Sequence, residues 1–130
     1  MSRLPRFQEH LKTGFTAEAV SAAYFRAYAE RAEKAGKTNL AARWRDLAAE
    51  KDRLAAIQLE AAGKVHDEVT ALRAALAEEK YENDVLYPRM MRDVDDQTAE
   101  VFRQVVAAQQ EQAAVLEQLQ DDLQSAAGDI

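Results

Sequence analysis

Six polar residues of this sequence stand at positions where the surrounding pattern requires apolar ones. They occur singly in the first half of the chain and in pairs three residues apart in the second half: Glu18, Lys51, Glu79 with Glu82, and Gln109 with Gln112. Ionised side chains that are buried without partners cost several kcal/mol each. A core layer with three carboxylates therefore needs a cation, a proton or water, and Lys51 is the cation that the sequence offers.

The elements that must position these residues are amphipathic helices. Apolar residues recur at three- and four-residue intervals, and the chain is rich in Ala, Leu, Glu, Gln, Arg and Lys, which favour helices. We predict an all-α fold with four helices, at about 5–35, 38–62, 67–94 and 96–126. In two antiparallel hairpins, equal distances from the turns bring the six polar residues into one layer.

Residues near the predicted helix ends support these bounds. Pro5 suits the first turn of a helix, and Thr38 is a candidate cap for the second helix. Gly36 supplies a left-handed stop, and Asp95 suits a helix start because its carboxylate meets free backbone amides. Pro88 must remove a hydrogen bond inside the third helix and kink it.

Length and composition define the class of protein. With 130 residues, 48% of them apolar, and no repeat, linker or shift in composition, the sequence predicts one four-helix domain. A net charge of −6 without a basic block argues against nucleic acid as a partner. The absence of cysteine excludes thiolate chemistry, and no run approaches the roughly 20 apolar residues that span a bilayer. We expect a soluble, cytoplasmic protein with no membrane partner.

Two segments carry recognisable motifs: residues 15–18, and residues 79–82 followed by 86–88. Together they resemble the rubrerythrin family, whose ferritin-like four-helix bundles hold two iron ions and in many members reduce peroxide. Phe15-Thr16-Ala17-Glu18 is similar to the entry to the family's first glutamate ligand. Glu79-Lys80-Tyr81-Glu82, followed by Leu86-Tyr87-Pro88, is similar to the third-helix motif of two glutamates before Tyr-Pro. The resemblance spans nearly the whole chain and implies a ferritin-like bundle with Glu18, Glu79 and Glu82 at metal-ligand positions.

The same resemblance shows which ligands are replaced. The family's second helix carries a glutamate and, three residues later, a histidine, where this chain has Lys51 and Leu54. Its fourth helix carries the same pair, where this chain has Gln109 and Gln112. Three carboxylates, a lysine and neutral amides fit two divalent ions poorly, because iron needs ligand charge and imidazole close by. We therefore expect no cofactor.

The connection between the second and third helices bears on assembly. In the family's bundle these helices run parallel, so the connection must return along a helix roughly 35 Å long, which takes about ten extended residues. Residues 63–66 are too few. Either the chain forms an up-down-up-down bundle, or two chains exchange halves. We expect a homodimer, with a domain swap as the favoured form and other protein partners unidentified.

Two hypotheses of function follow. The first is a rubrerythrin-like protein with a degenerate diiron site, catalytically silent, with a structural or interaction role and no catalytic residue. The alternative is a metal-binding oxidoreductase, such as a peroxide reductase, with iron or another divalent metal on Glu18, Glu79 and Glu82. Neither hypothesis identifies a substrate or an electron donor.

Overall fold

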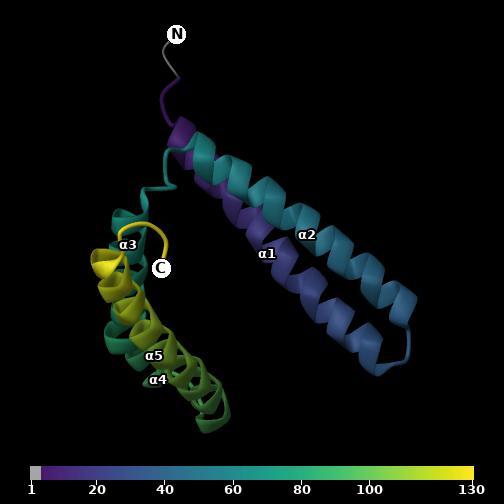
Figure 1. Ribbon diagram of the computed structural model, residues 1–130. Helices are drawn as coiled ribbons and strands as arrows, with labels where there is room; N and C mark the ends of the chain where they lie inside the picture. Colours follow the sequence, from purple (N-terminus) through teal and green to yellow (C-terminus); the bar gives the residue numbers. More distant parts are fainter. Residues whose placement is uncertain (1–3) are drawn as a thin grey trace. The chain divides into compact units, whose positions relative to one another are not determined.

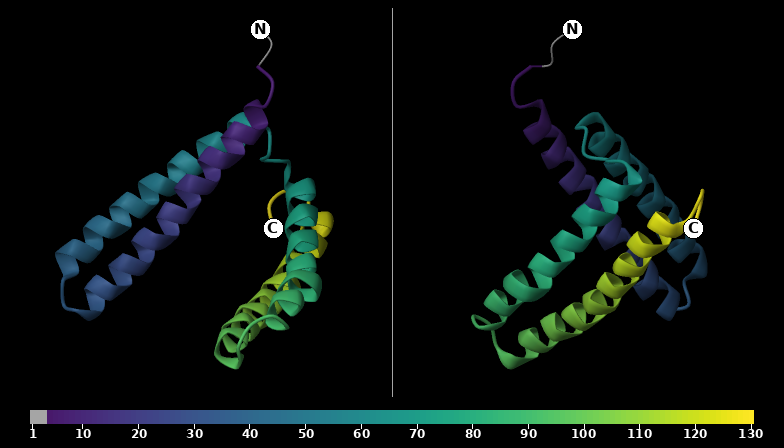
Figure 2. Two further views of the ribbon diagram at one scale, coloured as in Figure 1. Left: turned by 180° about the vertical axis from the view of Figure 1, so that it is seen from behind. Right: turned by 60° about the vertical axis from the view of Figure 1, so that its left-hand side comes forward.

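The structure is a computed structural model that describes residues 4–130, and all of its regular secondary structure is helical. This confirms the prediction of an all-α chain. The helices form two compact units that join in sequence after Val65, and each unit is an antiparallel hairpin (Figures 1 and 2). A single four-helix domain would require the hairpins to pack on one another, so the predicted single domain stays a prediction.

The first hairpin consists of α1, Phe7–Lys34, and α2, Thr38–Ala61. Gly36 adopts the left-handed conformation between them (φ 76°), and the Lys37 N–H donates to the Ala32 carbonyl at 2.8 Å, which closes α1. Two details of the predicted ends are wrong. The helix starts two residues after Pro5, because Arg6 is left-handed (φ 68°), and Lys37 rather than Thr38 is the cap residue of α2, without a side-chain bond.

Alanine holds the helices of the first hairpin together. Ala41, Ala48 and Ala55 recur every seven residues along α2 and are almost fully buried. Positions seven residues apart lie on the same side of a helix, so small side chains there let the two backbones approach closely. All buried apolar residues in the described part of the chain are alanines, and the larger apolar side chains keep some exposed surface.

The second hairpin consists of α3, Glu68–Tyr81; a π-helical turn, η1, Glu82–Leu86; α4, Tyr87–Met91; and α5, Asp96–Ser125. Asp67 accepts a bond from the Thr70 N–H at 2.9 Å, and Asp95 accepts one from the Thr98 N–H at 2.7 Å. Both aspartates are therefore side-chain caps, and the predicted start of the last helix is confirmed.

The π-helical turn is how this chain accommodates Pro88. In a regular α-helix the residue at position 88 would donate to the carbonyl of Asp84, which proline cannot do. The Tyr87 N–H instead donates to the Glu82 carbonyl, five residues earlier, and the α-helix resumes with Pro88 in its first turn. The wider turn begins at Glu82, so it contains the second glutamate of the Glu79 and Glu82 pair and also Asn83.

Candidate functional site

The polar residues of the first hairpin form an ion pair across its two helices. Lys51 Nζ of α2 lies 2.7 Å from Glu18 Oε2 of α1, and the two side chains are 31% and 24% exposed. Glu18 Oε2 is buried and makes no aligned hydrogen bond, so the contact is one of charge and distance rather than direction. The carboxylate and the ammonium neutralise each other within the hairpin.

Two side chains of α2 stand on the same side of the helix as Lys51. Trp44 and Gln58 lie seven residues before and after it. The Trp44 ring meets Phe25 in a tilted arrangement and Tyr28 edge-on, at ring centroid distances of 5.1 and 5.0 Å. Gln58 donates to the Leu54 carbonyl at 3.2 Å. The opposite helix makes room for it with a glycine, because a Cβ on Gly14 would lie 1.8 Å from Gln58 Oε1. Leu54 itself is half-buried and has no ligand atom.

The polar residues of the second hairpin form an open cluster. Gln109 Nε2 of α5 donates to Glu82 Oε1 at 3.0 Å across the hairpin. Three acceptor oxygens of this hairpin are buried without a hydrogen-bond partner, and they belong to Glu79, Asn83 and Gln109. Unpaired buried acceptors are unusual in folded proteins, because such groups nearly always bind a donor, a water or an ion. Gln112, by contrast, is exposed.

Asn83 is the member of this cluster that the sequence-based reasoning missed. It is only 8% exposed, and it is the one buried polar side chain in the part of the chain that the structure describes. It lies four residues after Glu79, which is the spacing of neighbours on one helix face. That spacing was visible in the sequence, but the π-helical turn that begins at Glu82 was not.

The two hairpins also differ in charge. Residues 1–65 contain 12 basic and 8 acidic side chains, whereas residues 66–130 contain 5 basic and 15 acidic ones. The stretch from Gln104 to Ile130 has no basic residue. The net charge of the chain conceals this division, which the sequence-based reasoning overlooked when it found no shift in composition.

Hydrogen bonds to the cap residues lower the pKa of two carboxyls in the second hairpin. The Thr70 N–H holds the pKa of Asp67 below its usual value, and the Thr98 N–H does the same for Asp95. Both groups lie at helix starts, remote in sequence from the polar cluster. Their ionised form therefore favours the folded hairpin.

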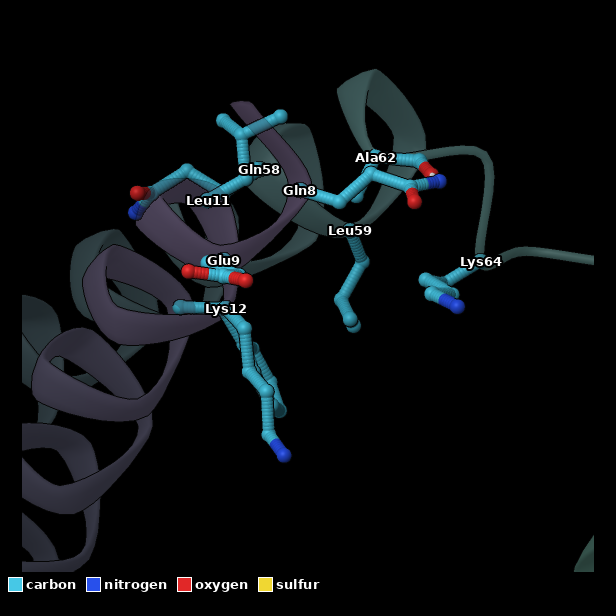
Figure 3. Close-up of a pocket in the computed structure, with 9 residues that line it drawn as sticks. Gln8, Glu9, Leu11, Lys12, Gln58, Leu59, Ala62 and Lys64 are labelled. Carbon is cyan, nitrogen blue, oxygen red and sulfur yellow. Dashed lines mark hydrogen bonds between the residues drawn. The ribbon is translucent and has the colours of Figure 1, made fainter. Parts of the chain in front are cut away.

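The structure places the predicted site residues in two groups, one per hairpin. Glu18, Lys51 and Leu54 belong to the first, and Glu79, Glu82 and Gln109 belong to the second. Within residues 4–130, no three or more histidine, cysteine, aspartate or glutamate side chains come together as a metal-binding group. The first hairpin also has a hollow of about 380 Å³ near its open end, where Leu59 lies between Lys12 and Lys64 in the view of Figure 3.

Two comparisons with known proteins were without a match. Models of known protein families give no match to this chain, and no curated protein is significantly similar to it in sequence. Along residues 4–130, no helix is both long and apolar enough to cross a membrane.

Proposed function

We propose that this chain is a catalytically silent, cytoplasmic member of the rubrerythrin-like bundles, with a structural or interaction role. The observation that carries the proposal is the contact of 2.7 Å between Lys51 Nζ and Glu18 Oε2. The ammonium of Lys51 contacts Glu18, which is the first carboxylate of the family's ligand pattern. Lys51 itself stands at a position where the family has another glutamate. A fixed positive charge there opposes the binding of a divalent cation by Coulomb repulsion.

The remaining donor set supports the same conclusion. The family uses histidine at the positions of Leu54 and Gln112, but one of these side chains has no ligand atom and the other is exposed. The amide of Gln109 donates its N–H to Glu82, so one carboxylate oxygen already has a partner. These residues do not fit a pair of iron ions, and the proposed role involves no diiron chemistry.

One observation favours the alternative, a protein that binds a single divalent metal. The unpaired oxygens of Glu79, Asn83 and Gln109 are all acceptors, and oxygen acceptors are the ligands that hard divalent cations take. An ion on this hairpin would be held without Glu18 or Lys51. Peroxide reduction would then be the activity to assay.

Elemental analysis separates the two proposals. The protein is purified without chelator, then analysed before and after anaerobic incubation with ferrous iron or manganese. We expect almost no bound metal. One ion per chain that is lost in Glu79→Gln but kept in Lys51→Met would overturn the silent function and support the single-metal alternative.

A gain-of-function variant tests whether the substitutions account for the silence. Lys51→Glu, Leu54→His, Gln109→Glu and Gln112→His together restore the ligand types of the family pattern. We expect this variant to take up iron where the unmodified chain does not. The matched control keeps Lys51 and carries the other three changes, and it should bind less iron because the ammonium remains.

A further inference from the structure

The hollow of about 380 Å³ at the open end of the first hairpin has a mainly apolar lining (Figure 3). Its apolar residues come from both helices and the end of α2: Leu11, Phe15, Leu59 and Ala62. The three larger side chains are only half-buried, so part of their apolar surface stays in contact with solvent. Hollows of this size with a mainly apolar lining and a few polar groups are typical binding sites for small molecules.

The two glutamines of the lining are held by the hairpin itself. Gln8 Nε2 donates to the Ala62 carbonyl at 3.0 Å, and Gln58 Nε2 donates to the Leu54 carbonyl at 3.2 Å. Both amides therefore use a donor within the hairpin. The charged side chains of the lining then decide which kind of polar group the hollow can accept.

These charged side chains are Glu9, Lys12 and Lys64, and only the carboxylate has a partner of opposite charge. Arg6 Nε lies 2.8 Å from Glu9 Oε2, so the charge of Glu9 is balanced beside the hollow. Along residues 4–130, neither Lys12 nor Lys64 forms an ion pair. The hollow is therefore positively charged, and its two ammonium groups are available to an anion.

The end of α2 explains why Lys64 lies at this hollow. Gly63 is left-handed (φ 70°), and the Lys64 N–H donates to the Leu59 carbonyl at 3.0 Å, which turns the chain back over the last helical residues. Lys12 comes from α1, and the Leu59 side chain lies between the two lysines in Figure 3. Two cationic side chains thus stand on either side of an apolar one.

The second hairpin has an apolar hollow of similar size, about 440 Å³, with the opposite charge. Its lining includes Leu72, Leu119 and Leu123, but its charged side chains are Glu68 and Asp129. A carboxylate ligand would be repelled there and attracted at the first hollow. Charge therefore distinguishes two hollows that both offer apolar surface.

We propose that the hollow of the first hairpin binds an amphipathic organic anion, a carboxylate with an unbranched alkyl chain of the fatty-acid class. The alkyl chain lies against Leu11, Phe15 and Leu59, where it covers apolar surface that is otherwise in contact with water. The carboxylate accepts charge-assisted hydrogen bonds from Lys12 and Lys64. This binding involves neither a metal nor the ion pair of Lys51 with Glu18.

A nuclear magnetic resonance titration of the full chain tests the site. The ligands are octanoate, decanoate and dodecanoate, each below the concentration at which it forms micelles, and the readout is the backbone amide signals of residues 8–15 and 58–64. We expect the dissociation constant to fall about two- to fourfold for each added methylene, because each one buries further apolar surface. Decylammonium has the same chain as decanoate with the opposite charge, and it should bind at these residues at least about tenfold more weakly.

Two double variants with the same change of charge locate the anion. Lys12→Met with Lys64→Met should raise the dissociation constant for decanoate about tenfold and abolish its preference over decylammonium. The same two changes to glutamine give a second variant with the same expected loss. The matched control is Arg31→Met with Lys37→Met, which removes two cations beside the other apolar hollow of this hairpin, near its turn, and it should bind decanoate normally. Circular dichroism verifies the helix content of each variant.

Three results would overturn the proposed site. The first is an affinity that does not depend on chain length, and the second is an equal loss in the control variant. The third is a change in these signals that occurs only above the micelle-forming concentration, or only with vesicles of anionic phospholipid, since the chain would then bind a lipid surface rather than a single anion. No metal enters the readout, so its failure leaves the proposed function as it stands.

Discussion

Both hairpins have polar residues within an apolar stripe, but the partners of these residues differ. In the first, Glu18 is matched by Lys51 from the opposite helix, and the charges cancel locally. In the second, Glu82 is matched only by the neutral amide of Gln109, and acceptors of Glu79 and Asn83 stay unpaired. The ammonium of Lys51 balances the charge of Glu18, whereas the neutral amide of Gln109 leaves the charge of Glu82 unbalanced.

The division of charge extends this contrast to whole hairpins. The first is basic and carries its cation at the centre, while the second is strongly acidic and carries uncompensated carboxylates at its centre. Neither half is balanced by itself, although the net charge of the chain is modest. Two hairpins of the same architecture can therefore carry opposite charge, both at their centres and over their whole length.

The largest expected effect comes from a carboxylate added to the open cluster. Asn83→Asp changes the shape of the side chain very little, but it buries a further negative charge beside Glu79 and Glu82. We expect the free energy of unfolding at pH 7 to fall by about 2 kcal/mol or more. The loss should shrink as pH is lowered, because burial raises the pKa of the new carboxyl and protonation then removes its charge.

Chemical denaturation at pH 7 and pH 5 measures this effect. Asn39→Asp is the matched control, because Asn39 is exposed on α2 and the change of charge is the same. It should alter stability little at either pH. An Asn83→Asp protein as stable as the control would mean that the second hairpin already holds a cation, and the contrast between open and closed centres would be wrong.

A smaller effect is expected from removal of the cation of the closed pair. Lys51→Met keeps the length of the side chain and leaves Glu18 without its partner. Because both side chains keep about a quarter to a third of their surface exposed, the loss should lie between those of exposed and buried pairs, at about 1–2 kcal/mol.

Lys80→Met supplies the matched control in the second hairpin. Lys80 Nζ lies 3.5 Å from Glu117 Oε1, with both side chains more than half exposed, so its removal should cost less than about 1 kcal/mol. In a double-mutant cycle, Glu18→Gln should recover part of the stability lost in Lys51→Met. If Lys51→Met and Lys80→Met lower the free energy of unfolding equally, the pair of Lys51 with Glu18 stabilises the hairpin no more than an exposed pair does.

Much of this fold could be predicted from sequence, because helical periodicity is a local property. The predicted bounds of the long helices agree with the structure to within a few residues, and the start at Asp95 was recognised from its type. The conformation of Arg6 was not predictable, since it depends on no pattern of residue types. The π-helical turn was missed because Pro88 indicates only that one hydrogen bond is lost and does not say how the helix responds.

The candidate site was predicted in part for a similar reason. The positions of Glu18 and Lys51 in their stripes pointed to a pairing that the structure contains. Their distances to the turn predict that Glu82 and Gln109 lie level, and the structure has a hydrogen bond between them. The burial of Asn83 was not predicted, because α-helical spacing does not apply across residues 82–86, which are π-helical. The difference in charge between the hairpins was predictable, because it follows from counting charged residues on either side of the boundary after Val65.

The smallest expected effect concerns how the two hairpins respond to acid. Asp67 and Asp95 cap helices of the second hairpin, and their pKa values are lowered from a usual value of 3.8. Because the folded pKa lies below the unfolded one, each cap contributes stability above about pH 4 and loses it as the pH falls through the folded value. In the first hairpin Arg53 lowers the pKa of Glu50, but that pair lies within α2 and caps no helix.

We therefore expect acid to loosen the second hairpin before the first. Amide hydrogen exchange between pH 2 and pH 5 would measure each hairpin separately in the full chain, after correction for the intrinsic pH dependence of exchange. Asp67→Asn with Asp95→Asn keeps an acceptor at each cap without a titrating group, so this variant should lose the acid-dependent part of the difference. If protection of α3 and α5 falls equally in the variant and the unmodified chain, the caps do not cause the acid response.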